Sequence, residues 1–440
     1  GGRDTPAVAL AAALAADACE IYPDVDGVYT TDPRELPEAR PVKRISYDEM
    51  LELASLGAGV MHNRSIEFAK KFSVPIHVRS SFTDQSGTMI VAEPETSDRA
   101  VCGAAMTKSE AQVTVQGLPD RPGASLAVFS AIAEHRITVD MIVQNVGEQG
   151  KADVSFTVPR DELAVTLESV GKAAGDLGAT GVSHDDNVAK VSVVGLGMAK
   201  RTGVADQMFR ALSEAGVNIE MISTSEIKIS VLVGRDDAQK ALRAVHHEFR
   251  LDQPPSQLNA ADSAIGVDEP DAVEIVRRLQ SMEELTIDDV SLDDSQARVT
   301  IAGVPDVPGV AADVFEQIAA SKIFVDMIVQ SFGREGQATL SFTVPQKSLA
   351  EATTIADQLA RRYECRSVTS SPRVAKLSVS GIGLRSHTEV AIRMFETLAE
   401  AGINVEMINT SEVRVNVVVE GQHGAAGLAS LQKAFAQFRR

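Results

Sequence analysis

Two short acidic turns carry the most informative polar chemistry in this 440-residue sequence. The segments LPDRPGAS and VPDVPGVA place Asp120 and Asp306 one residue before a Pro-Gly turn that opens a helix. The free backbone N–H groups of a helix start can bind a ligand carboxylate, and the aspartate can bind a ligand ammonium group. These groups together suit a small zwitterion. The same pattern is also an ordinary turn before a helix, and the residues alone leave both interpretations open.

Further acidic residues lie near the beginning of the chain. Asp4 follows two glycines and an arginine and precedes an alanine-rich stretch, a position typical of a helix N-cap. The segment DVDGVY at residues 24–29 follows an expected strand, CEIY. Loops at the carboxyl ends of parallel strands bind ligands in open α/β sheets. Aspartate and glycine are also common turn residues, so position alone favours a plain turn.

An internal repeat reveals the elements that must position these turns. Three strings recur at a constant offset of 186 residues (326 minus 140): DMIVQ at 140 and 326, SFTVP at 155 and 341, and MISTSE at 221, which returns as MINTSE at 407. A constant offset across three separate strings indicates that one intact block was duplicated with almost no insertions.

Each block divides into two units, so the chain contains four units that start near residues 111, 188, 297 and 374. In the first unit an alternating strand leads through a glycine-containing turn into a helix with one apolar face. Two further strands, a second helix at about residues 160–175 and a last strand complete the order β-α-β-β-α-β, the ferredoxin-like plan. Residues 251–295 join the blocks, and we expect a polar loop and then a helix, DAVEIVRRLQSM, at residues 271–282.

The composition limits the classes of function. Acidic residues outnumber basic ones by 61 to 42, and the net charge of −19 argues against a nucleic-acid-binding or anionic-membrane protein. Three cysteines favour a reducing compartment, so we expect a cytoplasmic protein. No Cys/His cluster has zinc-ligand spacing, and we expect no resident metal ion. The apolar stretch at residues 7–16 is too short to span a bilayer and lacks a signal peptide's basic leader.

Two long segments resemble the end of the kinase domain of aspartate kinases. They are ACEIYPDVDGVYTTDPR at residues 18–34 and ISYDEMLELASLGAGVMHNRSIEFAKKFSVPIHVRSSF at residues 45–82. The duplicated units are similar to ACT domains, the amino-acid-sensing modules that follow this kinase domain, and four of them match the longer arrangement in the family. The resemblance implies an α/β chain: the end of an amino acid kinase α/β/α sandwich followed by four ferredoxin-like (βαββαβ) ACT domains.

This resemblance divides the chain into six segments. They are the last part of the kinase domain at 1–98, ACT domains at 108–182 and 187–252, a linker at 253–294, and ACT domains at 295–368 and 372–440.

The resemblance also implies an activity. Aspartate kinases transfer the γ-phosphate of ATP, bound with Mg²⁺, to the β-carboxylate of L-aspartate, the first step towards lysine, threonine and methionine, and need no prosthetic group. Lysine, threonine or both would inhibit through the ACT domains. Because ACT domains tend to pair through sheet edges, we expect a homo-oligomer. The family's Lys-Phe-Gly-Gly type motif does not occur here, so we expect a fragment; the alternative is a non-catalytic, amino-acid-binding regulatory chain.

The family's motifs assign catalytic and nucleotide roles to particular residues. Asp4 would organise the phosphoryl-transfer groups, and Gly1, Gly2 and Arg3 align with the tail of the substrate loop. Phosphoryl transfer needs cationic and amide donors around its oxyanions, and Arg34 would bind phosphate oxygens. The nucleotide-binding candidates are Tyr22, Pro23, Asp24, Tyr29, Asp32, Pro33, Arg34, Gly59 and Val60.

The ACT resemblance assigns effector binding to both acidic turns and to a facing surface from another unit. The apolar residues Met141, Ile142 and Val143 between these candidates are expected in the core. The effector-binding candidates are Asp120, Gly123, Ala124, Ser125 and Gln144 in the first unit, Asn218, Ile219, Glu220, Thr224, Ser225 and Glu226 in the second, Asp306, Gly309 and Gln330 in the third, and Asn404, Glu406, Ser411 and Glu412 in the fourth.

Three residues depart from the family pattern. Arg3 stands where serine is usual, Pro23 where serine or threonine is usual, and Gly59 where many members carry lysine. The first two changes alter local polar contacts, and the third removes a nucleotide contact. His62 and His77 have no nucleophile or carboxylate beside them by motif, so we expect structural roles for both.

Overall fold

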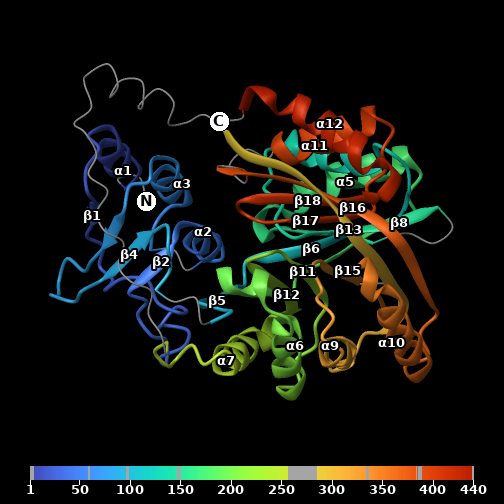
Figure 1. The fold of residues 1–440 in the computed structure, drawn as a ribbon, viewed down its shortest axis with the longest axis horizontal. Helices are drawn as coiled ribbons and strands as arrows, with labels where there is room; N and C mark the ends of the chain where they lie inside the picture. Colours follow the sequence, from blue (N-terminus) through green and yellow to red (C-terminus); the bar gives the residue numbers. More distant parts are fainter. Residues whose placement is uncertain are drawn as a thin grey trace.

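The computed structural model describes residues 4–57, 60–95, 99–145, 150–255, 285–332, 336–382, 384 and 389–438. The chain forms an N-terminal lobe, residues 4–95, beside a larger body that contains the four units (Figure 1). Gly1, Gly2, Arg3, Gly59 and the helix expected at 271–282 lie outside the described residues. Within the described ranges, no helix combines the length and the apolar character needed to cross a membrane.

The elements of the N-terminal lobe are α1 (Asp4–Ala13), β1 (Cys19–Ile21), β2 (Arg44–Ser46), α2 (Tyr47–Ser55), α3 (Asn63–Phe72), β3 (Ile76–Val78) and β4 (Thr88–Val91). The four strands form one sheet in the order β1-β3-β4-β2, with two parallel pairs and one antiparallel pair. Ser46 starts α2 with a capping box, because its hydroxyl accepts from the N–H of Glu49 and the Glu49 carboxylate binds back to Ser46. The lobe therefore supplies one small, mainly parallel sheet with helices packed on it.

The first block follows the predicted order in its first unit. A short strand, β5 (Gly103–Thr107), precedes it. Unit 1 contains β6 (Glu110–Pro119), α4 (Ala124–Ala133), β7 (Ile142–Gln144), β8 (Lys151–Pro159), α5 (Leu163–Leu177) and β9 (Gly181–Asp185). Unit 2 contains β10 (Val188–Val194), a 3-10 turn (Leu196–Lys200), α6 (Val204–Glu214), β11 (Met221–Thr224), β12 (Lys228–Gly234) and α7 (Ala238–Glu248).

The second block repeats this sequence of elements with longer strands. Its elements are β13 (Thr286–Pro305), α9 (Val310–Ala320), β14 (Ile328–Phe332), β15 (Gln337–Pro345), α10 (Leu349–Arg362), β16 (Ser367–Ile382), α11 (Glu389–Glu400), β17 (Met407–Thr410), β18 (Arg414–Glu420) and α12 (Gly424–Ala434). Unit 3 uses the second half of β13 and the first half of β16, and unit 4 begins with the second half of β16.

Units 2 and 4 differ from the predicted order at their edge strand. β5 pairs with β10 of unit 2, and the first half of β13 pairs with the second half of β16 in unit 4. The two pairings have the same register, since Met106 lies opposite Val191 and Leu292 lies opposite Leu377. Residues that precede units 1 and 3 in the sequence thus complete the sheets of units 2 and 4. The residue pattern of a short strand predicts the strand, but it does not show which distant sheet edge the strand will join.

The units pair crosswise between the two blocks. β11 of unit 2 pairs with β14 of unit 3, and β17 of unit 4 pairs with β7 of unit 1. Among the described residues this pairing links the strands of the body into one 14-stranded array. In Figure 1, α5, α11 and α12 lie above the strands, while α6, α7, α9 and α10 lie below them. One apolar core serves units 2 and 3, and another serves units 1 and 4.

A third, smaller apolar cluster lies where the two halves of the body meet. Its ten buried residues form five pairs of equivalent positions: Met141 and Met327, Val143 and Val329, Val188 and Val374, Met221 and Met407, and Leu232 and Val418. The body therefore has a pseudo-twofold axis through this cluster. Met141, Ile142 and Val143 are buried, as the sequence predicts.

Specific polar contacts surround this small apolar cluster. Asn145 Nδ2 donates to Ser331 Oγ at 2.6 Å, and Asn409 Nδ2 donates to Ser223 Oγ at 3.2 Å. The residues of each pair are 186 positions apart, so equivalent positions face each other across the axis. Buried polar contacts of this kind fix one relative arrangement of the blocks more strictly than apolar packing would.

The two large cores can be perturbed one at a time. Phe156 and Phe342 are equivalent, fully buried, and stacked edge-on against Phe129 and Phe315 respectively. Replacing either by alanine should cost about 3–5 kcal/mol in its own core. Hydrogen–deuterium exchange should therefore accelerate mainly in units 1 and 4 for F156A and mainly in units 2 and 3 for F342A. The exposed Phe82 supplies the control F82A, and equal acceleration in both halves from either core change would contradict separate cores.

Candidate functional site

The loop after β1 carries the first group of nucleotide candidates. The Tyr22 hydroxyl donates to Glu20 Oε2 at 2.7 Å, so this partly exposed ring is tied to the strand that precedes it. The Pro23 carbonyl accepts from both the N–H and the hydroxyl of Ser81, at 2.9 Å and 3.0 Å. Pro23 has no polar side chain, but its backbone carbonyl still accepts two hydrogen bonds. Asp24 is exposed beside it.

The second group of nucleotide candidates lies a few residues later. Arg34 Nη2 lies 2.7 Å from Asp32 Oδ2, and hydrogen bonds from Arg34 lower the pKa of the Asp32 carboxyl. The Arg34 side chain is 88% exposed, and Pro33 is exposed next to it. Tyr29 is half-buried, and burial raises the pKa of its hydroxyl. An incoming phosphate would have to share the guanidinium with Asp32.

The remaining candidates of the lobe lie on its helices. Asp4 is the first residue of α1, inside the helix rather than at its N-cap, where a carboxylate interacts favourably with the helix dipole. Thr5 Oγ1 lies 2.9 Å from Ser65 Oγ, which joins α1 to α3. Val60 is half-buried against the core of the lobe. The structure does not place Gly1, Gly2, Arg3 or Gly59 relative to them.

Both histidines of the lobe make local contacts, and His77 has a carboxylate beside it that the motif does not reveal, since its Nδ1 lies 3.5 Å from Glu20 Oε1. His62 Nδ1 accepts from the N–H of Arg64 and so caps α3. His77 Nε2 lies 2.8 Å from the carbonyl oxygen of Ser86.

The structure brings the acidic turn of unit 3 together with the predicted surface of unit 2. Asn218 Nδ2 donates to Asp306 Oδ1 at 2.9 Å, and Gln330 Nε2 donates to the carbonyl of Ile219 at 3.0 Å. Gly309, three residues after the aspartate and with φ at +99°, turns the chain into α9. This group of residues, cleft A, contains an aspartate, an amide and a helix start from two different units.

An equivalent group of residues joins units 1 and 4. Asn404 Nδ2 donates to Asp120 Oδ1 at 2.6 Å, and Gln144 Nε2 donates to the carbonyl of Val405 at 2.6 Å. The Ser125 hydroxyl donates to Gln144 Oε1 at 2.7 Å, next to the α4 start at Gly123 and Ala124. This group is cleft B, and its partner surface comes from unit 4 just as that of cleft A comes from unit 2.

A difference at one pair of equivalent positions in the two blocks gives the two clefts different charge. Glu406, beside cleft B, pairs with Arg298, which counteracts the rise in its pKa caused by burial. The residue equivalent to Arg298 is Gln112, whose side chain donates to the Met221 sulfur instead. Among the described residues, no arginine or lysine therefore takes the place of Arg298 beside Glu220 at cleft A. Burial, with Asp185 and Asp306 nearby, raises its pKa to about 7.

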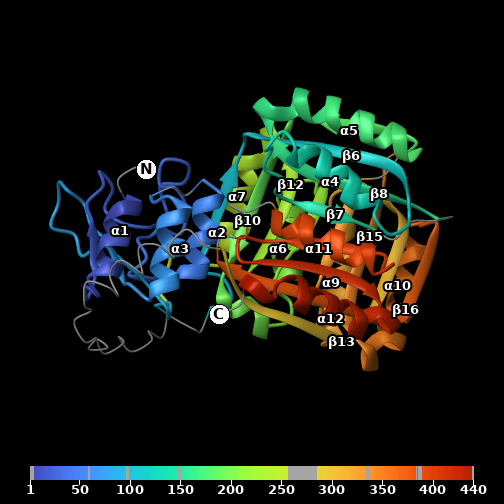
Figure 2. The same ribbon diagram turned by 90° about the horizontal axis from the view of Figure 1, so that it is seen from above.

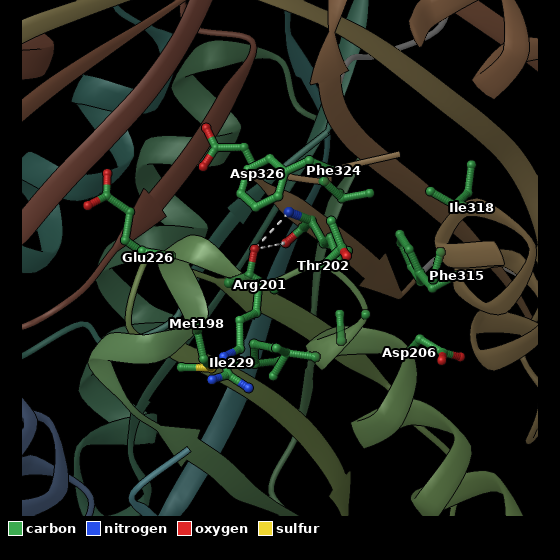
Figure 3. Close-up of a pocket in the computed structure, with 18 of the residues that line it drawn as sticks. Met198, Arg201, Thr202, Asp206, Glu226, Ile229, Phe315, Ile318, Phe324 and Asp326 are labelled. Atoms are coloured by element: carbon green, nitrogen blue, oxygen red, sulfur yellow. Dashed lines mark hydrogen bonds between the residues drawn. The ribbon is translucent and has the colours of Figure 1, made fainter. Parts of the chain in front are cut away.

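Thr224, Ser225 and Glu226 lie in a different cavity. They line a pocket of about 420 Å³ between units 2 and 3. Figure 3 shows the carboxylates of Glu226 and Asp326 on one side of this pocket, opposite Phe315 and Ile318. The sequence groups these residues with Asn218 as one surface, whereas the structure separates them into two cavities.

The equivalent pocket between units 1 and 4 is much smaller, about 70 Å³. Ser411 and Glu412 line it, together with Thr410, Asp140 and the aromatic ring of Phe129. Two copies of one pocket therefore differ in the space they offer a ligand.

Sequence reasoning missed Asp326, Lys376 and Arg414. Lys376 forms an ion pair with Asp326 and lies 4.0 Å from Glu226, which also pairs with Arg414. The repeated DMIVQ string contains Asp326, but its apolar residues point to a core strand. The pocket of about 420 Å³ that Glu226 lines, called the open pocket below, thus has both acidic and basic groups, which can form charge-assisted hydrogen bonds with a charged ligand.

Family models match most of the chain. The model of the amino acid kinase family matches residues 1–80, and models of the ACT domain match residues 112–175, 191–249, 299–358 and 377–435. An aspartokinase from Helicobacter pylori is 49% identical over 258 residues, which cover 58% of this chain and 63% of that relative. The chain thus spans somewhat under two thirds of the length of this curated relative.

Solved structures give the same family. The aspartate kinase from Synechocystis superposes with a TM-score of 0.70 at 36% identity, covering 99% of this chain and 74% of that chain. The aspartate kinase from Clostridium acetobutylicum, an allosteric enzyme, superposes with a TM-score of 0.51 at 26% identity and covers 57% of this chain and 58% of that chain.

The raised pKa of Glu220 predicts a pH-dependent stability. Its ordinary pKa is 4.5 and its folded value is about 7, so the folded protein binds this proton more tightly than the unfolded chain does. The free energy of unfolding therefore falls as pH rises between these two values and is constant, for this group, outside them. Glu220→Gln has no proton to lose at this position. The melting temperature of the variant minus that of wild type should therefore increase as pH rises from 4.5 to about 7.

Thermal melts of E220Q and wild type at about pH 5 and about pH 8 measure this effect. Glu168→Gln, on the exposed face of α5, is the control and should show no such change. An offset between E220Q and wild type that is the same at both pH values would contradict the assignment.

Proposed function

This chain belongs to the aspartate kinase family, and from that membership we propose that it is part of an aspartate kinase that transfers the γ-phosphate of ATP to the β-carboxylate of L-aspartate. The lobe would hold the nucleotide with the loop from Tyr22 to Arg34 and with the residues around Val60. Asp4 would organise the groups that transfer the phosphate. The family membership and the exposed Arg34 support this assignment.

We propose that cleft A and cleft B bind the regulatory amino acid. The free N–H groups at the starts of α9 and α4 would bind its α-carboxylate, and Asp306 or Asp120 would bind its ammonium group. In this structure an asparagine amide donates a hydrogen bond to each of these aspartates. One repeated observation supports this proposal. In both clefts, the aspartate of an Asp-x-Pro-Gly helix start accepts a hydrogen bond from an Asn side chain of another unit.

The open pocket at Glu226 suits a ligand with a second cationic group. Its carboxylates, Glu226 and Asp326, are partly neutralised by Lys376 and Arg414, which a ligand ammonium could replace. We therefore propose lysine for this pocket and threonine or lysine for the clefts. Glu220 makes cleft A the more acidic of the two.

The other parts of the proposal concern the setting of the enzyme. Mg²⁺ would arrive with ATP as part of the substrate. The three cysteines are free, which is consistent with a reducing compartment, and we propose the cytoplasm. Units 1 to 4 already pair with one another inside the chain, so a homo-oligomer would use other surfaces of the body.

An activity assay separates the kinase from the regulatory-chain alternative. The purified chain is assayed for ADP release that depends on L-aspartate. Turnover near that of a full-length relative would establish the kinase. No turnover, with retained lysine or threonine binding, would establish a non-catalytic regulatory chain.

Effector binding can be tested at both kinds of cavity. Asp120→Ala should weaken binding at cleft B and Glu226→Ala at the open pocket, each by about 10- to 100-fold, because a hydrogen bond to a charged group is lost. Calorimetric titration of L-lysine and L-threonine measures both changes. Asp161→Ala, in an exposed turn of unit 1, is the control. Unchanged affinities in both variants would remove these sites.

A further inference from the structure

Helix α2 of the lobe lies next to the body (Figures 1 and 2). It carries two carboxylates that are almost completely buried, Glu49 at 2% and Glu52 at 0% exposure. Glutamate is rarely buried unless it has partners. Both find them in the body: Glu49 Oε1 accepts from the N–H of Leu196 at 3.0 Å, and Glu52 Oε2 lies 2.8 Å from Lys228 Nζ.

Glu52 contacts both blocks of the body at once. Besides Lys228 of unit 2, its Oε1 accepts from the N–H of Glu412 of unit 4 at 3.0 Å. Burial lowers the pKa of Lys228, but Glu52, Asp140 and Glu412 together raise it above its ordinary value, so the lysine stays charged. A buried carboxylate held between two groups from different blocks is sensitive to their separation, because losing either partner leaves a buried charge poorly compensated.

The two contacted segments are equivalent loops that line the pockets. Residues 225–228 line the open pocket through Ser225 and Glu226, and residues 411–414 line the smaller pocket through Ser411 and Glu412. The loops are also joined to each other, since Arg414 pairs with Glu226. Loss of the Glu226 carboxylate therefore affects Arg414 directly. Arg414 lies two residues after Glu412, whose backbone N–H binds Glu52.

On the lobe side, Glu52 lies in the last turn of α2. The chain then passes through Val60, a nucleotide candidate, to the start of α3 at Asn63. Asn63 Nδ2 donates to Glu412 Oε2 at 3.1 Å. Both ends of this segment of the lobe are thus tied to loop 411–414.

We propose that Glu52 is a positioning residue that transmits the state of the Glu226 pocket to the α2–α3 segment of the lobe. Loss of the Glu226–Arg414 pair shifts loop 411–414, and Glu52 passes this shift to α2. The link itself follows from the contacts alone. Its effect on the nucleotide rests on the proposed function.

Hydrogen–deuterium exchange of the full chain tests the link without a ligand. Glu226→Gln, at a partly exposed position, breaks the pair with Arg414 and imitates the capture of Glu226. Exchange in peptides covering residues 47–55 and 63–72 should accelerate about threefold or more. The same change made in a Glu52→Gln background should produce no further acceleration there. Glu351→Gln, on the exposed face of α10, is the control and should leave these peptides unchanged.

Two results would overturn the proposal. One is unchanged exchange of α2 and α3 in E226Q, and the other is an equal response to E226Q with and without Glu52. If E52Q does not fold, E52Q/K228M replaces it, because removal of both charges avoids an unpaired buried ion.

A second arm adds L-lysine or L-threonine. In wild type, the bound amino acid should change exchange at residues 47–55, whereas E52Q/K228M should bind it within about threefold of the wild-type affinity without that change. A preserved response in the double variant would contradict the role of Glu52. Failure of wild type to bind either amino acid would reject the effector proposal. The exchange experiment with E226Q needs no ligand, so it would still test whether Glu52 transmits the change.

Discussion

Antiparallel pairing between the blocks, of β11 with β14 and of β17 with β7, is the interaction on which the rest of the structure depends. A ferredoxin-like unit has an open sheet edge, and each unit here covers one edge with a unit of the other block. The pairing places Asn218 against Asp306 and Asn404 against Asp120. It also brings loops 225–228 and 411–414 to the axis. The clefts, the pockets and the contact with the lobe are all consequences of this one arrangement.

Duplication followed by divergence explains why equivalent sites are not identical. The body keeps a symmetric apolar cluster, yet Arg298 stands opposite Glu406 where Gln112 would face Glu220. Lys190 pairs with both Asp140 and Glu110, whereas Gln296 replaces that glutamate beside Lys376. The lobe also contacts the two loops in different ways. It contacts loop 225–228 through the Lys228 side chain, and loop 411–414 through both the backbone N–H and the carboxylate of Glu412. The sequence relation is symmetric, but the chemistry of the paired sites is not.

Much of this could be predicted from the sequence because the repeat is nearly free of insertions. The unit order, the acidic helix starts and the buried Met141–Val143 segment all follow from local pattern. The origin of the edge strands of units 2 and 4 does not, because strand pairing between distant segments leaves no local signal. The sequence pattern also misses the separation of Asn218 from Glu226 into two cavities, because Asn218 precedes strand β11 and Glu226 lies in the turn that follows it. Glu49 and Glu52 resemble solvent-exposed helix residues until the body that covers them is present.

We infer that a small amino acid binds between units 2 and 3 or between units 1 and 4, at the carboxylates placed there by strand pairing. A crystal structure of the chain grown with L-lysine and L-threonine would show whether it does. We expect an amino acid whose ammonium group contacts Asp306, Asp120 or Glu226, with the asparagine or arginine partner displaced. Amino acids bound only elsewhere, with these carboxylates still held by their own side-chain partners, would contradict it.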